Sequence, residues 1–436
     1  MGSIPLFYRA AMGAARLAAP LLALGGSKVA RGAAGRRRAP ELFARWGEAE
    51  RDPSRPAVWF HAASVGEALQ AGAVISVLAA RMPDLQVAFT YFSPSAEGVG
   101  RRVGAHVAGY LPWDLPGPVG RALDGIKPDI LVFTKSEVWP VLVEGAVHRG
   151  VKVAIVGATI SPDGRRMRWP ASVVLGSTWP SLSLACASTE HDASRLIGLG
   201  VPESSVHTTG DPGVDSAATR AGETNRSSST LVPFHQDPAP TIVAGSTWPD
   251  DEKHLLPALA DVRTRVRGLR VIIAAHEPSQ RRVRDMLEKL ASMGWRSRTL
   301  EEIESSGSAK GTNAVVVERL GVLAQLYSVA HVAYVGGGFG DRGVHSVLEP
   351  AAARVPVVVG PRYLRTPAVK ALIRAGGAVA VGDRKRLADT LTGWLTDRGA
   401  QSAAAALAFG YIEAHRGAAE RTAALLGPLF APKRSA

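Results

Sequence analysis

Val335-Gly336-Gly337-Gly338-Phe339-Gly340 is the stretch of this sequence that decides its fold. An apolar run, residues 329–335, leads into the glycines, and a short helical pattern, residues 347–353, follows them. This order predicts a strand, a loop and a helix, in which backbone N–H groups and a helix N-terminus can hold a phosphate. Glycine allows the backbone to approach an anion closely because it has no Cβ atom. A tight strand-to-helix turn without a ligand remains the alternative.

The same loop continues as Gly343-Val344-His345-Ser346-Val347-Leu348-Glu349-Pro350. Glu349 is expected about one turn into the helix. A carboxylate offers several acceptor sites, so this side chain can take both vicinal hydroxyls of a ribose. The pattern therefore predicts a nucleotide site, with a surface glutamate as the alternative interpretation.

Apolar runs alternate with helical patterns on both sides of this loop, which predicts an α/β fold with parallel sheets and helices on both faces. No Gly-x-Gly-x-x-Gly follows the first strand and no Walker A lysine motif occurs, which disfavours dinucleotide oxidoreductases and P-loop enzymes. The expected strands are 58–62, 86–92, 130–133, 151–156, 241–244, 271–275, 313–317, 332–335, 355–359 and 378–381.

Residues 221–240 are polar, proline-containing and aperiodic, which predicts a linker between two domains. We therefore expect two Rossmann-like, doubly wound domains that face each other across a cleft. The expected segments are a basic amphipathic segment (1–40), a first domain (41–220), the linker (221–240), a second domain (241–410) and a C-terminal helix and tail (411–436).

The net charge of +13 is concentrated at the N-terminus. Residues 1–40 contain seven basic residues, among them Arg36–Arg38, and no acidic one. The longest uncharged run, Leu17–Ser27, is shorter than the roughly 20 residues that cross a bilayer. We expect a helix over Ile4–Leu24 that lies on an anionic membrane surface, with a disordered basic arm as the alternative. No aromatic platform accompanies the charge, so nucleic acid is not an expected partner.

Charged residues follow two of the expected strands of the first domain. Glu67 comes shortly after residues 58–62 and can act as a general base, although Ser64-x-x-Glu67 also fits a capping box. Lys135 and Glu137 follow residues 130–133 and are expected in the same cleft, with a solvated turn as the alternative. The single cysteine, Cys186, excludes an internal disulfide and is expected in the core.

Two further features lie in the second half. His276 is expected at the end of a strand, where its imidazole can donate a hydrogen bond to a nucleotide. The alternative is a histidine that makes only a structural hydrogen bond. The acidic run Asp250-Asp251-Glu252 opens a helix, where acids complement the dipole, so we expect a helix cap and no metal site.

Taken in order, seven motifs resemble the 3-deoxy-D-manno-octulosonic acid (Kdo) transferase family. The resemblance extends from about Arg45 to Asp383, which is nearly all of both expected domains. The motifs are Arg45-Trp46-Gly47-Glu48, Ser64-Val65-Gly66-Glu67, Leu111-Pro112-Trp113-Asp114, Ser136-Glu137-Val138-Trp139-Pro140, Gly245-Ser246-Thr247, His276-Glu277-Pro278 and the loop Gly336–Glu349.

The resemblance implies an inverting GT-B glycosyltransferase of lipopolysaccharide biosynthesis, with CMP-Kdo as donor and a lipid A precursor as acceptor. It implies Glu67 as proton acceptor. Because a nucleoside monophosphate carries less charge than a diphosphate, we expect no cofactor and no metal. Because CMP-Kdo is a soluble cytoplasmic metabolite, we expect a location on the cytoplasmic face of the bacterial inner membrane. A phosphate is expected on Gly337 and Gly338. The nucleotide contacts implied by the family are Ala275, His276, Leu320, Gly321, Val322, Ser346, Val347, Leu348 and Glu349.

The sequence departs from the family pattern at four positions. Lys135 replaces a glutamate, Gly213 replaces a basic residue, Ser346 replaces an asparagine and Ala275 replaces an arginine. One hypothesis is that Lys135 supplies the cation that Gly213 lacks. Two other functions stay open: a GT-B enzyme that uses a UDP-sugar for lipid-linked transfer or epimerisation, and a non-catalytic family member.

Overall fold

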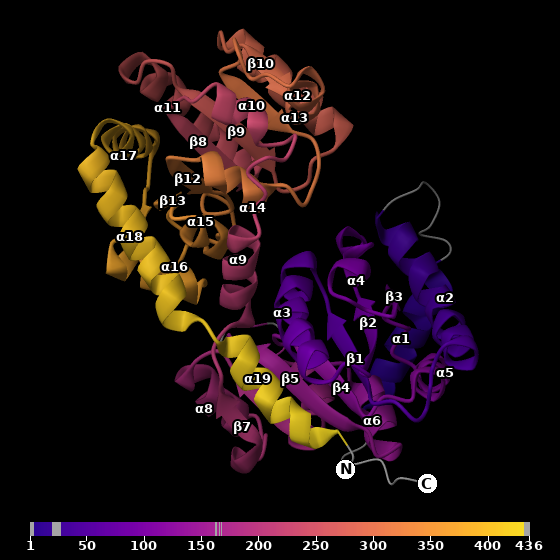
Figure 1. The fold of residues 1–436 in the computed structure, drawn as a ribbon. Coiled ribbons are helices and arrows are strands. Elements are labelled where there is room, and N and C mark those ends of the chain that lie inside the picture. Colours follow the sequence, from indigo (N-terminus) through magenta and orange to yellow (C-terminus); the bar gives the residue numbers. More distant parts are fainter. Residues whose placement is uncertain (1–3, 20–27, 162–163, 165, 167, 431–436) are drawn as a thin grey trace. The chain divides into compact units, whose positions relative to one another are not determined.

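Two parallel sheets of seven strands each organise the chain. Figure 1 shows the computed structural model as a ribbon. The chain divides into a first unit, residues 1–216 with 416–436, and a second unit, residues 217–415. The structure describes residues 4–19, 28–161, 164, 166 and 168–430.

The first sheet has the strand order β3-β2-β1-β4-β5-β6-β7. The order reverses between β1 and β4, and in doubly wound sheets ligands bind beyond the carboxyl ends of the strands at such a switch point. Its strands are β1 (Ala57–Ala62), β2 (Gln86–Tyr91), β3 (Val107–Tyr110), β4 (Ile130–Thr134), β5 (Lys152–Ala158), β6 (Leu184–Ala187) and β7 (Val206–Thr208).

Helices cover both faces of the first sheet. On one face Trp59 of β1 belongs to the same buried cluster as Phe43 and Leu123. On the other face its neighbour Phe60 belongs to the cluster of Ile75. The two clusters alternate along β1 because successive side chains of a strand point to opposite faces. The helices are α2 (Lys28–Ala49), α3 (Val65–Arg81), α4 (Val99–Arg102), α5 (Pro116–Ile126), α6 (Pro140–His148), α7 (Ala171–Leu175), α8 (Glu190–Gly198) and α19 (Ala418–Leu426).

The second sheet has the order β10-β11-β9-β8-β12-β13-β14, and its switch point lies between β8 and β12. All paired strands are parallel. The strands are β8 (Thr241–Thr247), β9 (Arg270–Ala275), β10 (Ser297–Thr299), β11 (Ala314–Val317), β12 (Val332–Val335), β13 (Val357–Val359) and β14 (Ala378–Ala380).

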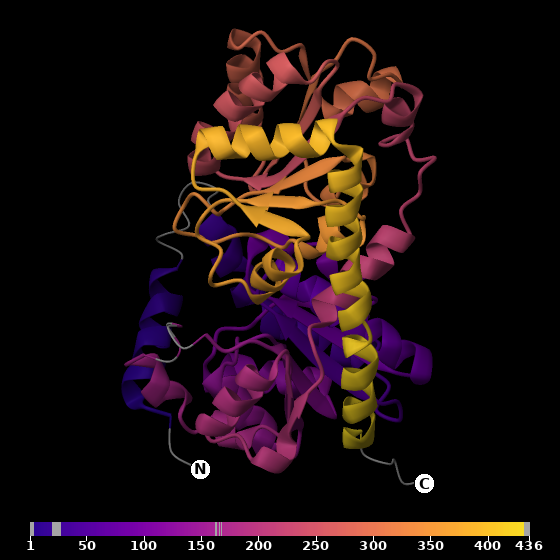
Figure 2. The same cartoon turned by 90° about the vertical axis from the view of Figure 1, so that its left-hand side faces the viewer.

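Helices again lie on both faces of the second sheet. Leu259 of α11 and Leu391 of α17 pack on one face, and Ile303 of α13 packs on the other. Figure 2 shows α17 and α18, in yellow, meeting at a sharp angle. The helices are α10 (Val232–Gln236), α11 (Pro249–Arg265), α12 (Gln280–Ser292), α13 (Leu300–Ser306), α14 (Leu323–Leu326), α15 (Leu348–Ala352), α16 (Pro367–Ala375), α17 (Arg384–Thr396) and α18 (Arg398–His415); α9 (Pro212–Gly222) crosses the boundary between the units.

The prediction of two parallel-sheet α/β units is confirmed, and every expected strand is present within a few residues. The sequence analysis did not predict β3, β6, β7 and β10, because strands of three or four residues carry little periodicity. β6 is the apolar run around the buried Cys186. The expected linker, residues 221–240, lies in the second unit, where Leu231 and Phe234 are buried against the sheet.

The N-terminal segment contributes two helices to the first unit. In α1 (Leu6–Ala18) the Tyr8 hydroxyl donates to the buried Asp114 carboxylate over 2.8 Å, and Arg9 pairs with Glu144 at 2.8 Å. Residues 20–27 lie outside the described residues, and with them most of the run Leu17–Ser27 and the end of the helix expected over Ile4–Leu24. Within the described part of the chain, every helix is too short or too polar to cross a bilayer.

We predict that Tyr8→Phe destabilises the docking of α1 in a pH-dependent way. Burial raises the pKa of Asp114 to about 6, while hydrogen bonds from Tyr8 and from two backbone N–H groups oppose the rise. The unfolded value is lower, near 4, so the stability contribution of Asp114 falls as the pH increases from about 4 to about 6. Removing the hydroxyl raises the pKa of Asp114 further. The free energy of unfolding should fall by about 1–3 kcal/mol at pH 8 and by less at pH 4.

The measurement is urea denaturation of the full-length protein at both pH values. Tyr363→Phe is the matched control, because no hydrogen bond of the Tyr363 hydroxyl to the described residues is seen. An equal loss at pH 4 and pH 8 would contradict the coupling between Tyr8 and the Asp114 charge.

Candidate active site

The predicted site residues lie near the carboxyl ends of strands in each sheet, at or beside its switch point. In the first unit Glu67 lies in the first turn of α3, after β1, and Lys135 immediately follows β4. In the second unit His276 follows β9 and the glycine loop follows β12. Neighbouring parallel strands end at the same edge of a sheet, so residues far apart in sequence meet there.

Glu67 combines the two roles that the sequence left open, that of a helix-capping residue and that of a candidate general base. The Ser64 hydroxyl accepts the Glu67 N–H at 3.4 Å, as in a capping box, but the Glu67 carboxylate accepts from Ala63 N at 2.7 Å. Burial raises the pKa of Glu67, while Lys135 and the backbone N–H groups oppose the rise. A half-buried carboxylate with a raised pKa is a suitable general base near neutral pH.

Glu137 lies in the same electrostatic cluster. Burial raises its pKa, Arg166 lowers it, and the charge of Glu67 raises it. The Arg166 guanidinium lies 3.6 Å from the Glu137 carboxylate and donates to the Val138 carbonyl at 2.9 Å. Two carboxylates and a guanidinium therefore share one edge of the first sheet.

Lys135 lies within electrostatic reach of two partly buried acids. Its backbone is left-handed, with φ of 65°, which is uncommon for a residue with a side chain. Its charge lowers the pKa of Glu67 and of Asp211 against the effect of burial. A Cβ atom on Gly213 would lie 2.9 Å from the Asp211 carboxylate and 3.0 Å from the Gln70 amide, so a larger residue at 213 requires rearrangement.

Sequence reasoning missed Arg36, Arg166 and Asp211 as members of this cluster. The Arg36 guanidinium lies 3.5 Å above the Phe92 ring and donates to the Phe92 carbonyl at 3.1 Å. Burial lowers the pKa of Arg36 to about 10, and Glu137 raises it. The expectation that Arg36 contacts lipid headgroups with Arg37 and Arg38 is therefore corrected: it packs inside the first unit. Its helical spacing from Ala39 and Phe43, both buried, is the available signal.

The glycine loop of the second unit is organised by Asp251. This fully buried carboxylate accepts hydrogen bonds from Trp248 N (2.9 Å), the Tyr334 hydroxyl (2.9 Å), Gly337 N (2.7 Å) and Phe339 N (3.3 Å). The capping prediction for Asp251 is confirmed, and the same carboxylate also holds the loop. The Gly337 N–H that was expected to hold a phosphate thus has an internal acceptor.

Close backbone packing explains the glycines themselves. A Cβ atom on Gly337 would collide with the Gly343 carbonyl, and one on Gly338 would lie 2.6 Å from Gly360 N. Gly337 also has φ of 95°, which favours glycine. The loop therefore needs glycine for its own packing, whether or not a ligand approaches it.

The remaining predicted nucleotide contacts lie at the same edge of the second sheet. Ala275 ends β9, and the His276 ring stacks on His345 at 4.2 Å between centroids. Glu349 forms an ion pair with Arg220 of α9. The others follow β11 (Leu320, Gly321, Val322) or belong to the segment that enters α15 (Ser346, Val347, Leu348).

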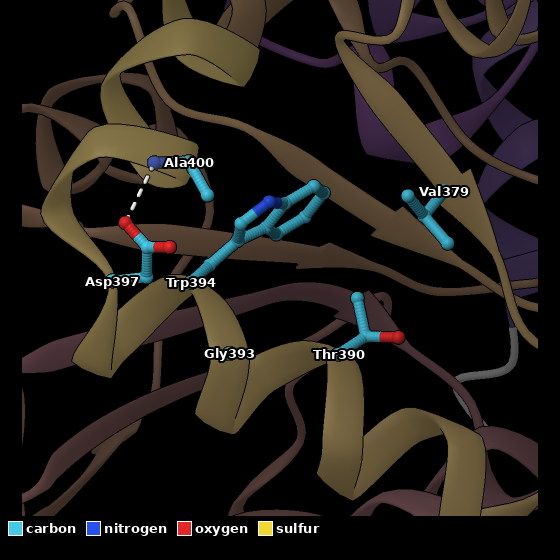
Figure 3. Close-up of a pocket in the computed structure, with 6 residues that line it drawn as sticks. All are labelled: Val379, Thr390, Gly393, Trp394, Asp397 and Ala400. Atoms are coloured by element: carbon cyan, nitrogen blue, oxygen red, sulfur yellow. Dashed lines mark hydrogen bonds between the residues drawn. The ribbon is translucent and has the colours of Figure 1, made fainter.

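A surface hollow of about 310 Å³ lies elsewhere in the second unit, between β14, α17 and the start of α18 (Figure 3). Its lining includes Trp394, Thr390 and Asp397, and Asp397 accepts from Ala400 N at 2.9 Å. None of the predicted site residues lines it. Across the described ranges, no three His, Cys, Asp or Glu side chains are grouped so as to hold a metal ion.

Comparison with known proteins supports the resemblance. The family model described as 3-deoxy-D-manno-octulosonic-acid transferase (kdotransferase) matches residues 39–216. The 3-deoxy-D-manno-octulosonic acid transferase of Bordetella pertussis is 27% identical over 405 residues, 88% of this chain and 90% of the relative. That of Haemophilus influenzae is 26% identical over 349 residues, 79% and 80% of the two chains.

Among solved structures, UDP-GlcNAc 2-epimerase from Neisseria meningitidis has a similar fold, with a TM-score of 0.60 and 16% identity over 85% of this chain and 100% of that chain. At this identity the likeness concerns the fold alone. The two parallel sheets give the chain a GT-B-like α/β fold. Residues 39–216 match the Kdo transferase family model, and the chain is similar over most of its length to Kdo transferases, which are glycosyltransferases.

We predict that Asp251→Asn loosens the glycine loop. An amide keeps one acceptor oxygen but turns an NH₂ group toward backbone donors, so at least one buried N–H loses its acceptor. Such a loss costs about 1–3 kcal/mol. Hydrogen exchange at Gly337 and Phe339 should accelerate about tenfold or more.

Asp250→Asn is the matched control, since Asp250 is exposed and pairs with Lys253 at the surface. It should leave exchange in the loop unchanged, because exposed ion pairs contribute little. Equal protection of Gly337 in wild type and Asp251→Asn would refute the role given to Asp251.

Proposed function

We propose that this protein is an inverting glycosyltransferase that transfers Kdo from CMP-Kdo to a lipid A precursor. The observation that carries this proposal is Glu67, a half-buried carboxylate with a raised pKa at the β1/β4 switch point, within the residues that match the Kdo transferase family model. The relatives from Bordetella pertussis and Haemophilus influenzae, named for Kdo transfer, support the substrate class.

In the proposed reaction Glu67 takes the proton of an acceptor hydroxyl while that oxygen attacks the anomeric carbon of Kdo. The bond between this carbon and the phosphate oxygen breaks, and CMP leaves with the bonding electrons. Lys135 and Arg166 lower the pKa of Glu67 and so keep part of it ionised as the base. The same cations are suited to a sugar acid or a phosphorylated acceptor, since both are anionic.

The nucleotide is assigned to the second unit. Glu349 is the proposed ribose acceptor, and it must exchange its ion pair with Arg220 for the ribose hydroxyls. CMP carries less charge than a nucleoside diphosphate, so protein donors suffice to stabilise it and we propose a reaction without metal. Transfer should then persist in the presence of a chelator.

We predict that Glu67→Gln lowers kcat at least about 100-fold, because the amide cannot accept the proton. The free enzyme needs ionised Glu67, so kcat/KM of the wild type should fall at low pH. The midpoint of this fall should lie above the ordinary glutamate pKa, because burial raises the pKa of Glu67. The assay uses purified full-length protein with CMP-Kdo and a defined lipid A precursor, read out by mass spectrometry of the product.

Glu41→Gln is the matched control, because Glu41 is an exposed carboxylate that pairs with Arg45 and Arg121. Wild-type turnover by Glu67→Gln would remove Glu67 as the base. Nucleotide binding without any transfer by the wild-type chain would favour the non-catalytic alternative, and thermal stabilisation by UDP but not by CMP would favour a UDP-sugar enzyme.

We also propose that α1 brings the enzyme to the cytoplasmic face of the inner membrane, where a lipid acceptor and soluble CMP-Kdo meet. Leu6, Phe7 and Leu17 are exposed on one face of α1, whereas Tyr8 and Met12 on the opposite face pack against the first unit. Arg37 and Arg38 of α2 are exposed and available to anionic headgroups. Deleting residues 1–40 would also remove Arg36 and Tyr8, so point substitutions test the proposal better.

We predict that replacing Leu6, Phe7 and Leu17 together by glutamine weakens binding to anionic phospholipid vesicles at least about 100-fold. Each apolar side chain buried in a membrane contributes about 1.5–3 kcal/mol. Co-sedimentation is the measurement, and CMP affinity should not change. The matched control replaces Leu364 and Leu407, exposed leucines of the second unit. Unchanged sedimentation of the triple variant would contradict the membrane proposal.

A further inference from the structure

Three rings from three separate segments meet beyond the carboxyl ends of β8, β9 and β12. The imidazoles of His276 and His345 stack with centroids 4.2 Å apart and 17° between their planes. The Trp248 indole stacks on His276 at 4.7 Å, and its plane is only 18° from that of His345, 6.2 Å away. Trp248 and His345 are thus almost parallel neighbours, and His276 stacks against both.

A hydrogen bond fixes the state of one ring. Trp248 Nε1 donates to Nε2 of His345 over 2.8 Å. An indole nitrogen is only a donor, so Nε2 is the unprotonated nitrogen and the neutral imidazole carries its proton on Nδ1. Within the described part of the chain Nδ1 makes no hydrogen bond, and it is not among the buried atoms that lack a partner. This N–H therefore faces solvent.

The surroundings keep the imidazole neutral. Burial, together with the nearby His276 and Arg342, lowers the pKa of His345 to about 4. The Arg342 guanidinium lies 4.0 Å from the centroid of the Trp248 ring. At neutral pH His345 is consequently a neutral N–H donor in a cationic environment, which suits an anionic ligand.

The rings occupy the position in which the second sheet is expected to bind a ligand. Trp248 is the first residue after β8, and the backbone N–H of His345 donates to the carbonyl of Gly336, the first residue after β12. β8 and β12 flank the switch point. The backbone donors Gly337 N and Phe339 N are already bound to Asp251, so these two N–H groups are not available to a phosphate in this loop and a side-chain donor can take their place.

We infer that His345 binds the phosphate of the donor nucleotide through Nδ1–H, and that Trp248 is the positioning residue that fixes this tautomer. The identity of the nucleotide rests on the proposed function, but the chemistry requires only a nucleoside monophosphate group. The indole acts through the imidazole: it leaves Nδ1 as the protonated nitrogen and holds the ring beside the glycine loop.

The test measures the tautomer and CMP affinity in the full-length protein. Nitrogen-15 NMR of histidine should show Nδ1–H for His345 in the wild type. Trp248→Phe keeps an aromatic ring but removes the N–H donor, so Nε2 becomes able to carry the proton and the pKa of His345 rises. The dissociation constant of CMP, from calorimetry, should increase about tenfold, as expected for the loss of one hydrogen bond.

Trp295→Phe is the matched control, because the buried Trp295 Nε1 has no hydrogen-bond partner in the described structure. It should change neither the tautomer nor CMP affinity. His345→Phe should weaken CMP binding to a similar degree, and the double variant with Trp248→Phe should be little weaker than His345→Phe alone, because both act through one donor. In turnover, Trp248→Phe should raise KM for the donor and leave kcat largely unchanged.

An Nε2–H tautomer in the wild type, wild-type CMP affinity in either single variant, or additive effects in the double variant would overturn the inference. Its failure is distinguishable from failure of the proposed function. A chain that binds CMP through His345 but transfers no Kdo would overturn only the proposed function. A chain that transfers Kdo with unchanged CMP affinity in Trp248→Phe would overturn only the inference.

Discussion

The structure of the second unit depends on one buried carboxylate, Asp251. A buried charge is costly unless each of its acceptor sites is filled, and Asp251 meets this condition with four donors. These donors come from the end of β8, from β12 and from the glycine loop. The carboxylate therefore joins the two strands of the switch point and sets the positions of Trp248 and the loop. Packing alone would leave the loop backbone without acceptors.

The first unit also has carboxylates that are shielded from solvent, but their hydrogen bonding differs from that of Asp251. Its carboxylates at the β1/β4 edge have fewer donors, and burial raises the pKa of Glu67, Glu137 and Asp211. Arg166 and Lys135 oppose that rise without neutralising every acid. A carboxylate with a raised pKa and few donors can exchange a proton. A carboxylate whose acceptor sites are all filled by hydrogen bonds has a structural role. The contrast between Glu67 and Asp251 thus separates a chemical role from an architectural one.

The departures from the family pattern have a physical context in the first unit. Lys135 replaces an acid, and it lies within electrostatic reach of Asp211, next to the position where the family carries a cation. The tight contacts around Gly213 leave little room for a long basic side chain unless Gln70 or Asp211 moves. The distribution of charge differs from that of the family pattern, while acids and cations still share one edge of the sheet.

The sequence by itself determined the α/β class, the two parallel sheets, the cap at Asp251 and the placement of Glu67, Lys135 and the glycine loop after strands. These features follow from local periodicity and from motifs a few residues long. Tertiary structure decided which N–H groups of the loop are occupied, that Arg36 and Arg166 join the acids, and that Trp248, His276 and His345 stack. Such contacts join residues dozens to a hundred positions apart, and no local pattern encodes them. Short edge strands such as β10 also form only because a neighbouring strand supplies the hydrogen bonds.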